Sequence, residues 1–193
     1  MLGRIGLGFA LGTSAIVMMS LPVSARSLEV HVDHLRNGGT IPTTYSFCAP
    51  AAQGHAGPGP DINPRISWSG GPRGTKSYAI LLSDTDSPAE HREMMNKEGM
   101  SLTAAVKRKT FYHWVLVDIP ANVTSIAEGA VSKGSVPHGR PAMPSPVGTA
   151  GMNDYTVAFA ANDAMKGDYF GYDGPCPPWN DENVITTISR SMR

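Results

Sequence analysis

Glycine and proline interrupt this sequence so often that it leaves no room for long helices. The 193 residues include 21 glycines and 16 prolines, which cluster in turns between short apolar stretches. Leu28–Val32 and Arg65–Ser69 alternate apolar and polar side chains, as half-buried strands do. Ser77–Ser83 and Phe111–Ile119 are almost entirely apolar, which predicts central strands buried on both faces. The pattern therefore predicts one mainly β domain, an antiparallel β-sandwich with a few short helices.

The segments between these strands are interpreted from their turn content. Ala49–Pro64 and Gly129–Met152 are rich in glycine and proline, so we expect both to be loops without strands. Ala89–Lys109 is charged, and we expect a helical turn at Glu90–Lys97. Tyr155–Ala160 predicts a further strand. Loops of this length in a compact domain usually carry function.

Charge and motifs exclude several classes of protein. The formal net charge is zero, which argues against a polybasic nucleic-acid-binding or membrane-surface protein, so we expect no nucleic-acid partner. The sequence has no Gly-x-Ser-x-Gly elbow, no His-Glu-x-x-His or Cys-x-x-Cys metal motif and no Gly-Lys-Ser/Thr phosphate loop. We therefore expect no catalytic residue, no metal site and no cofactor.

The first 25 residues have the pattern of a secretory signal peptide. A stretch without charged side chains separates Arg4 from Arg26; its middle is mostly apolar and it ends in Val23-Ser24-Ala25. We expect cleavage after Ala25, export to the periplasm, and no membrane span in the single domain formed by residues 26–193. An uncleaved anchor is the alternative, because roughly 20 uncharged residues can span a bilayer.

Two carboxylates at the end of an apolar strand are the most informative local feature. Asp84 and Asp86 directly follow Ser77–Ser83, and residues at this spacing face the same side of extended backbone. Such a pair can bind a metal ion, share a proton or cap backbone amides, whereas the simpler alternative is an Asx turn before Pro88. His113, in the other apolar strand, is either a buried core histidine or a group whose tautomer one of these carboxylates fixes.

Gly174-Pro175-Cys176-Pro177-Pro178 is a second candidate segment. Its glycine and prolines make a rigid loop, and a rigid rim loses little entropy when a ligand binds. The alternative is a stiff connection between strands. The chain has two cysteines, Cys48 and Cys176, and export would permit a disulfide between them. The sequence leaves open whether they pair.

Together these segments resemble the phosphatidylethanolamine-binding protein family, in its bacterial Raf-kinase-inhibitor-like branch. The resemblance runs from about Leu28 to Glu182. It is carried, in the family's order, by Asn63-Pro-Arg-Ile-Ser-Trp-Ser69, Gly74-Thr-Lys-Ser-Tyr78, Asp84-Thr-Asp-Ser-Pro88, Tyr112-His-Trp114, Asp118-Ile-Pro120, Glu128-Gly129, Asn153-Asp-Tyr155 and Gly171-Tyr-Asp-Gly-Pro-Cys-Pro-Pro178. Asp-x-Asp-x-Pro, His-Trp and Gly-Pro-Cys-Pro-Pro in this order are highly specific.

The resemblance implies a β-sandwich with a small anion pocket at one end and a non-enzymatic binding function. The expected ligand is a small anionic or phosphate-bearing molecule, such as a phospholipid head group. Carried over from the family, the ligand-binding residues are Asp84, Asp86, Pro88, Phe111, His113, Gly174, Pro175 and Cys176. We expect the two carboxylates to hold the imidazole of His113, and the imidazole to be protonated when an anion binds. Affinity should then fall as the pH rises past the histidine pKa.

Two other functions stay open at this stage. One is inhibition or regulation of a partner protein, such as a kinase or protease, through the loop Ala89–Lys109. The other is weak hydrolysis by His113 with Asp84 or Asp86, although no nucleophile is evident.

The last residues depart from the family's pattern. Family members continue with a strand and a C-terminal helix, whereas this chain reads Val184-Ile-Thr-Thr-Ile-Ser-Arg-Ser-Met-Arg193. Ile185 and Thr187 stand where the resemblance places a histidine and a tyrosine of the pocket. A family-like strand would read Val-His-His-Tyr-His-Phe-Thr-Val-Tyr-Ala. Codons can be chosen for this strand that, after deletion of one base, translate into the tail observed here. We therefore expect residues 183–193 to be a frameshifted tail, with the C-terminal strand and helix lost or altered, one pocket wall opened and a sheet edge exposed.

Overall fold

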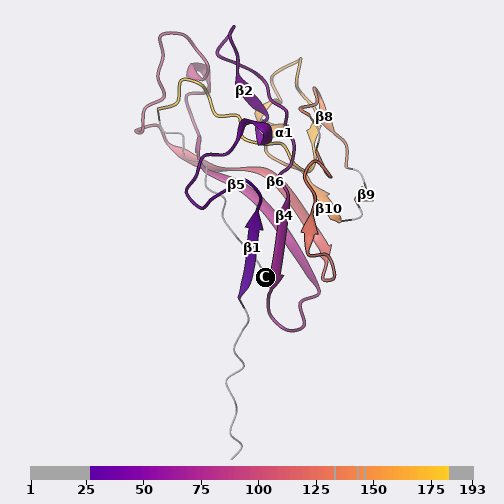
Figure 1. Cartoon of the computed structure of the whole chain (residues 1–193). Helices are drawn as coiled ribbons and strands as arrows, with labels where there is room; N and C mark the ends of the chain where they lie inside the picture. The colour runs from indigo at the N-terminus through magenta and orange to yellow at the C-terminus, as the bar shows by residue number, and fades with distance from the viewer. Residues whose placement is uncertain (1–26, 133, 143, 146, 183–193) are drawn as a thin grey trace, which may run out of the picture.

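Two antiparallel sheets form the body of the protein. The computed structural model describes residues 27–132, 134–142, 144–145 and 147–182; the expected signal peptide and the expected frameshifted tail lie outside this part. The larger sheet has the order β5–β6–β10–β9, formed by Ser77–Pro88, Arg108–Pro120, Gly148–Gly151 and Pro144–Ser145. The smaller has the order β1–β4–β7, formed by Leu28–Val32, Ile66–Gly70 and Ser125–Ile126. Figure 1 shows β5 and β6 as the long ribbons that cross the molecule.

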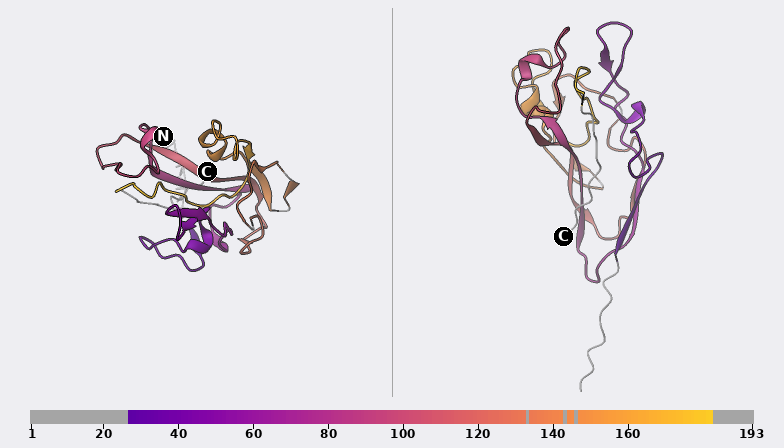
Figure 2. Two further views of the ribbon diagram at one scale, coloured as in Figure 1. Left: turned by 90° about the horizontal axis from the view of Figure 1, so that it is seen from above. Right: turned by 90° about the vertical axis from the view of Figure 1, so that its left-hand side faces the viewer.

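Apolar side chains from both sheets meet between the two layers. The right-hand view of Figure 2 shows these layers from the side. Trp68 of β4 and Leu82 of β5 are buried in this core. Trp114, Leu116 and Ile119 of β6 pack against them, each at most 1% exposed. Burial of this apolar area is the main force that holds the sheets together. The predicted mainly β sandwich is confirmed.

Short elements cover the end of the sandwich where β5 ends and β6 begins. They are the hairpin of β2 and β3 (Cys48–Pro50 and Ala56–Pro58), the parallel pair of β8 and β11 (Gly139–Arg140 and Asp168–Tyr169), the 3₁₀ turns η1 (Thr43–Tyr45) and η2 (Arg92–Met94), and the helix α1 (Tyr155–Ala158). The helical turn expected within Glu90–Lys97 is confirmed as η2. None of the helices in the described ranges is long and apolar enough to cross a membrane.

Two expectations for the segments between strands are wrong. Ala49–Pro64 is not free of strands, because β2 and β3 pair within it. Gly129–Met152 contains β8, β9 and β10, and β10 lies so close to β6 that a Cβ atom on Gly151 would come within 2.5 Å of the Val115 side chain. Glycine has a low propensity for strands, but at position 151 the close packing of β10 on β6 leaves little space for a side chain.

Two further expectations fail for identifiable reasons. Tyr155–Ala160 is helical at its start, where the Asn153 side chain accepts a hydrogen bond from the Tyr155 backbone N–H at 3.0 Å and begins the turn. Phe159 then stacks on Tyr155 with ring centroids 5.3 Å apart, the i, i+4 contact of a helix. Strand β5 is not a central strand buried on both faces: it pairs with β6 alone among the described strands, and most of its side chains are half-buried. Strand β6 is central, between β5 and β10, but it is not buried on both faces either, because Tyr112 and Asp118 are exposed.

Candidate ligand pocket

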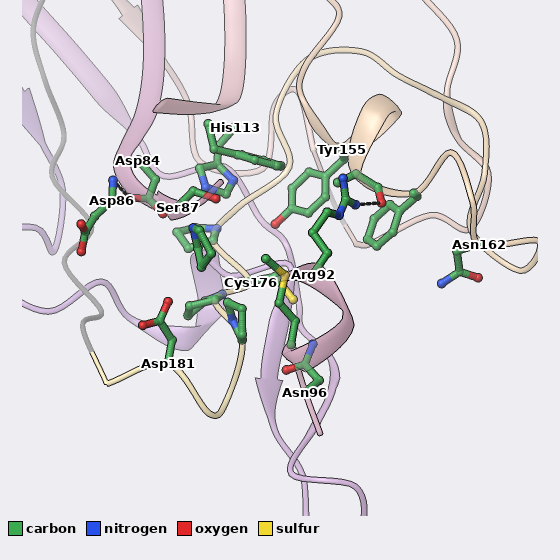
Figure 3. Close-up of a pocket in the computed structure, with 18 residues that line it drawn as sticks. Asp84, Asp86, Ser87, Arg92, Asn96, His113, Tyr155, Asn162, Cys176 and Asp181 are labelled. Carbon is green, nitrogen blue, oxygen red and sulfur yellow. Dashed lines mark hydrogen bonds between the residues drawn. The ribbon is translucent and has the colours of Figure 1, made fainter. Parts of the chain in front are cut away.

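A cavity of about 380 Å³ opens at the end of the sandwich covered by the short elements. The end of β5, the start of β6, η2, α1 and residues 175–178 contribute to its wall (Figure 3). Its volume is within the range of pockets that hold small ligands.

Irregular pairing between β5 and β6 directs the key side chains of this cavity. Leu82 pairs with Trp114 and Ser83 with Tyr112, so His113 is an extra residue in β6. Consecutive residues His113 and Trp114 are both buried as a result, one in the pocket wall and the other in the core. A bulge of this kind turns a side chain out of the regular alternation and is common beside functional sites.

A second irregularity lies in β5 at the paired carboxylates. Asp84 pairs with Phe111 and Ser87 with Lys109, which leaves one more residue in β5 than in β6 over this interval. The Asp84 carboxylate accepts a hydrogen bond from the backbone N–H of Asp86 at 2.8 Å. The Asx turn considered as the simpler alternative is therefore present, and it holds a residue of the pocket wall.

His113 is deeply buried and electrically neutral at neutral pH. The residue is only 4% exposed, and its Nδ1 atom has no hydrogen-bond partner within the described residues. Burial lowers the pKa of His113 to about 4. The imidazole of the free protein is therefore uncharged near pH 7, and its protonation when an anion binds stays a prediction. Within the described residues, no carboxylate bonds to its Nδ1 atom.

The pKa of Asp84 is shifted in the opposite direction, upward from its usual value. Burial raises the pKa of Asp84, and the charges of Asp86 and Asp181 raise it further, although the hydrogen bond from the Asp86 N–H opposes them. A carboxyl group of this kind takes up a proton at a higher pH than an exposed aspartate does. Asp84 then loses its charge and gains an O–H donor.

The rim loop that begins at Gly174 is fixed from behind the pocket. Cys176 forms a disulfide with Cys48 of β2, which decides the pairing that the sequence left open. The Gly174 carbonyl accepts from the Tyr155 hydroxyl at 2.7 Å, and its N–H donates to Asp61 Oδ1 at 2.7 Å. A Cβ atom at this position would lie 1.9 Å from the carbonyl oxygen of Tyr45, so only glycine fits.

Behind Gly174 lies a buried charge cluster that no local sequence pattern predicts. The Arg140 guanidinium contacts Asp61 Oδ2 at 3.2 Å and also pairs with Asp173. Both carboxylates are at most 1% exposed, and Asn153 donates to Asp173 at 2.7 Å. Burial raises the pKa of Asp173 to about 7 and that of Asp61 above its usual range. Two neighbouring buried carboxyl groups with one guanidinium favour retention of a proton between them.

The structure brings together seven of the eight residues that the sequence singled out for ligand binding. Asp84, Asp86, Pro88, Phe111, His113, Pro175 and Cys176 all line the cavity, whereas Gly174 does not. Their binding role stays a prediction. Reasoning from sequence missed the remaining lining residues, which are Ser87, Arg92, Met95, Asn96, Tyr155, Ala158, Phe159, Asn162, Pro177, Pro178 and Asp181.

Some of these omissions had a visible signal. Arg92 and Asn96 lie in the charged loop that the sequence had marked as functional by its length, and the i, i+4 spacing of Tyr155 and Phe159 is helical. Across the residues with described positions, no group of three or more His, Cys, Asp or Glu side chains is arranged to hold a metal ion.

Comparison with known proteins decides the family. Residues 32–184 match the family described as phosphatidylethanolamine-binding protein. The chain belongs to this family. A UPF0098 protein of Aquifex aeolicus is 28% identical over 152 residues, which are 78% of this chain and 59% of that relative. UPF0098 protein YbcL of Escherichia coli is 25% identical over 171 residues, 88% of this chain and 70% of YbcL.

A solved structure supports the same assignment within the phosphatidylethanolamine-binding protein family. The crystal structure of E. coli YbcL, described as a new member of the mammalian PEBP family, has a TM-score of 0.50 and 26% identity over 78% of this chain and 67% of that one. The resemblance found in the sequence is thus confirmed, including its bacterial branch. The chain spans about three-fifths of the Aquifex relative's length. Membership of this family supports a binding function.

Proposed function

We propose that this member of the phosphatidylethanolamine-binding protein family is an exported, non-enzymatic binding protein for small anionic or phosphate-bearing ligands. The observation that carries the proposal is the cavity itself, which contains a buried imidazole whose Nδ1 atom has no partner among the residues that the structure describes. A buried polar atom without a partner costs free energy, and a ligand that hydrogen-bonds to it recovers that cost. Apolar walls with a few polar groups are typical of small-ligand sites.

The disulfide supports export. Cys48 and Cys176 are bonded, and such bonds persist in oxidising compartments such as the periplasm. A signal peptide cleaved after Ala25 would direct the chain there.

Filling the cavity tests whether the ligand binds in it. Ala158 lines the pocket, so Ala158→Phe should abolish the saturable rise in melting temperature that phosphate, acetate or phosphoethanolamine gives to the unaltered protein. Ala161→Phe is the matched control, because Ala161 is exposed and outside the lining; it should keep the rise. Absence of any saturable effect on the unaltered protein, by melting and by calorimetry, would contradict the proposal.

Acid should strengthen anion binding in this pocket. Dimethyl phosphate keeps one negative charge between pH 4 and pH 8, so it separates titration of the protein from titration of the ligand. Its affinity should rise as the pH falls from 7, because Asp84, with its raised pKa, loses its charge, and again towards the His113 pKa of about 4.

Asp84→Asn provides the control for this pH dependence. Asparagine can accept the same hydrogen bond from the Asp86 N–H, so the turn is kept while the charge is removed. The variant should bind dimethyl phosphate more tightly at pH 7 and show a flatter pH profile, measured by calorimetry. An affinity that increases with rising pH would count against an anion site.

A further inference from the structure

One wall of the pocket comes from a segment with little support of its own. Met95 and Asn96 line the cavity, and they belong to residues 94–100, the wall segment, which begins at the end of η2. No residue of η2 is buried. The backbone φ angles of Asn96 and Gly99 are +57° and +73°, in the left-handed region, and a residue other than glycine keeps such a conformation only where its surroundings hold it. The shape of the wall segment therefore depends on contacts with the rest of the protein.

The side chain of Asn180 supplies such contacts. Its amide nitrogen donates to the backbone carbonyls of Met94 at 2.9 Å and Met100 at 3.1 Å, with a longer contact of 3.5 Å to that of Lys97. Its oxygen accepts from the Asn96 backbone N–H at 2.9 Å. Donor and acceptor of the amide thus both meet matching backbone groups. Since Asn180 is only 9% exposed, the wall segment is folded around one nearly buried side chain.

The backbone at Asn180 is held by contacts that do not involve this side chain. The Asn180 carbonyl accepts from the Leu102 N–H at 3.0 Å. The next residue, Asp181, pairs with the Arg108 guanidinium through both carboxylate oxygens, at 2.6 and 3.0 Å. A substitution that removes the Asn180 side chain should therefore leave the chain at positions 180 and 181 in place and release the wall segment alone.

The wall segment lies away from the buried imidazole. Figure 3 shows Asn96 across the pocket from Asp84 and His113. Asn180 itself is not one of the lining residues. A ligand that bonds to His113 at the end of β5 and β6 therefore meets the wall segment with the remainder of the molecule.

We infer that Asn180 is a positioning residue of the pocket: it holds the wall segment in place and so determines the affinity for the part of a ligand that lies farthest from His113. The inference rests on the proposed function and adds to it the residue that controls the fit of this part. A wall that is already fixed loses little conformational entropy when a ligand binds, whereas a mobile wall must first be ordered.

Two probes of different length test this role. Inorganic phosphate is too small to contact both sides of a cavity of about 380 Å³, whereas butyl phosphate carries the same charged group on an alkyl chain. Butyl phosphate should bind the unaltered protein more tightly than phosphate does. Asn180→Ala should weaken butyl phosphate binding about tenfold and leave phosphate binding within about threefold, both measured by calorimetry. Hydrogen exchange should become faster in residues 94–100 and stay unchanged in β5 and β6.

Asn63→Ala is the matched control. Asn63 is also a buried asparagine that fastens a loop, but residues 127–132 of that loop contribute nothing to the pocket lining. Its side chain makes four hydrogen bonds to the backbone, with Pro64, Ala127, Val131 and Ser132. Asn63→Ala should lower the melting temperature as Asn180→Ala does, without changing the ratio of the two affinities.

Asn180→Asp is a second variant that keeps the acceptor for the Asn96 N–H and removes the donors. At pH 7 it should bind butyl phosphate as weakly as Asn180→Ala does. Its ratio of butyl phosphate to phosphate affinity should rise towards pH 5, because burial raises the pKa of a carboxyl group and the protonated form donates to a carbonyl again. Asn180→Ala should show no such rise, so this pH profile separates loss of the donors from a general loss of structure.

The inference and the proposed function can fail separately. Equal loss of both affinities in Asn180→Ala, or butyl phosphate that binds the unaltered protein no more tightly than phosphate, would overturn the inference and leave the proposed function standing. If the unaltered protein bound neither probe, both would be overturned.

Discussion

Arg140→Gln should lower the free energy of unfolding by about 3–5 kcal/mol, which is a large part of the roughly 5–15 kcal/mol that stabilises a typical domain. The guanidinium contacts both Asp61 and Asp173, and neither carboxylate has access to water for compensation. Removing one partner of a buried ion cluster leaves the remaining charges unpaired, which costs more than the cluster contributes when complete.

The loss should depend on pH. Asp173 already has a pKa of about 7 with Arg140 present, and without the guanidinium the pKa of both carboxyl groups should rise further. The folded variant would then hold protons that the unfolded chain releases above about pH 4, so its stability should fall as the pH rises. Urea unfolding at pH 5 and pH 8 should show the larger loss at pH 8.

A surface arginine provides the control for this experiment. Arg65 is 55% exposed and lies 4.0 Å from Asp33, so Arg65→Gln should change the free energy of unfolding by less than about 1 kcal/mol. An Arg140→Gln protein as stable as Arg65→Gln, or one equally weakened at both pH values, would show that the buried cluster does not act as described.

The same cluster also bears on the pocket, although none of its members lines it. Asp61 accepts the hydrogen bond from Gly174 at the start of the rim loop, and Asp173 donates its backbone N–H to the His113 carbonyl at 3.0 Å. A substitution of Arg140 should therefore also affect the rim loop at Gly174 and strand β6 at His113, which both shape the cavity.

Local patterns predicted the strands of regular alternation and seven residues of the cavity wall. β1 and β4 follow directly from side chains that alternate between apolar and polar, and β6 from its apolar run. The motifs of the family resemblance brought seven lining residues together, because each motif lies at the end of a strand or in the rim loop.

What the sequence could not predict depends on contacts between distant residues. The β2–β3 hairpin is tied to the rim loop by the disulfide and by a hydrogen bond from the Phe47 N–H to the Pro175 carbonyl at 3.1 Å. Asp61 and Gly174 are 113 positions apart in the chain. The low pKa of His113 in the free protein could not be predicted for a related reason. Its burial depends on the bulge and on the ring of Tyr155, whose centroid lies 5.5 Å from that of the imidazole.

Removal of the disulfide is the second change with a large expected effect. Cys48→Ser together with Cys176→Ser should lower the free energy of unfolding by about 2–5 kcal/mol. The bond joins residues 128 positions apart, so it greatly restricts the unfolded chain. Urea unfolding of the unaltered protein with and without reductant, and of the double variant, measures the difference.

The pocket should respond to the same change because Cys176 is part of its wall. Without the bond, Pro175 is held through its carbonyl and Gly174 through Tyr155 and Asp61, while residues 176–178 lose their covalent tie to β2. Phosphate affinity should therefore fall several-fold in the double variant at a temperature where it is still folded. Reductant should affect the unaltered protein in the same way and leave the double variant unchanged. If the reduced and oxidised proteins were equally stable, the disulfide would not stabilise the fold, and it would no longer support export. If reduction weakens both stability and binding, the chain is suited to an oxidising compartment.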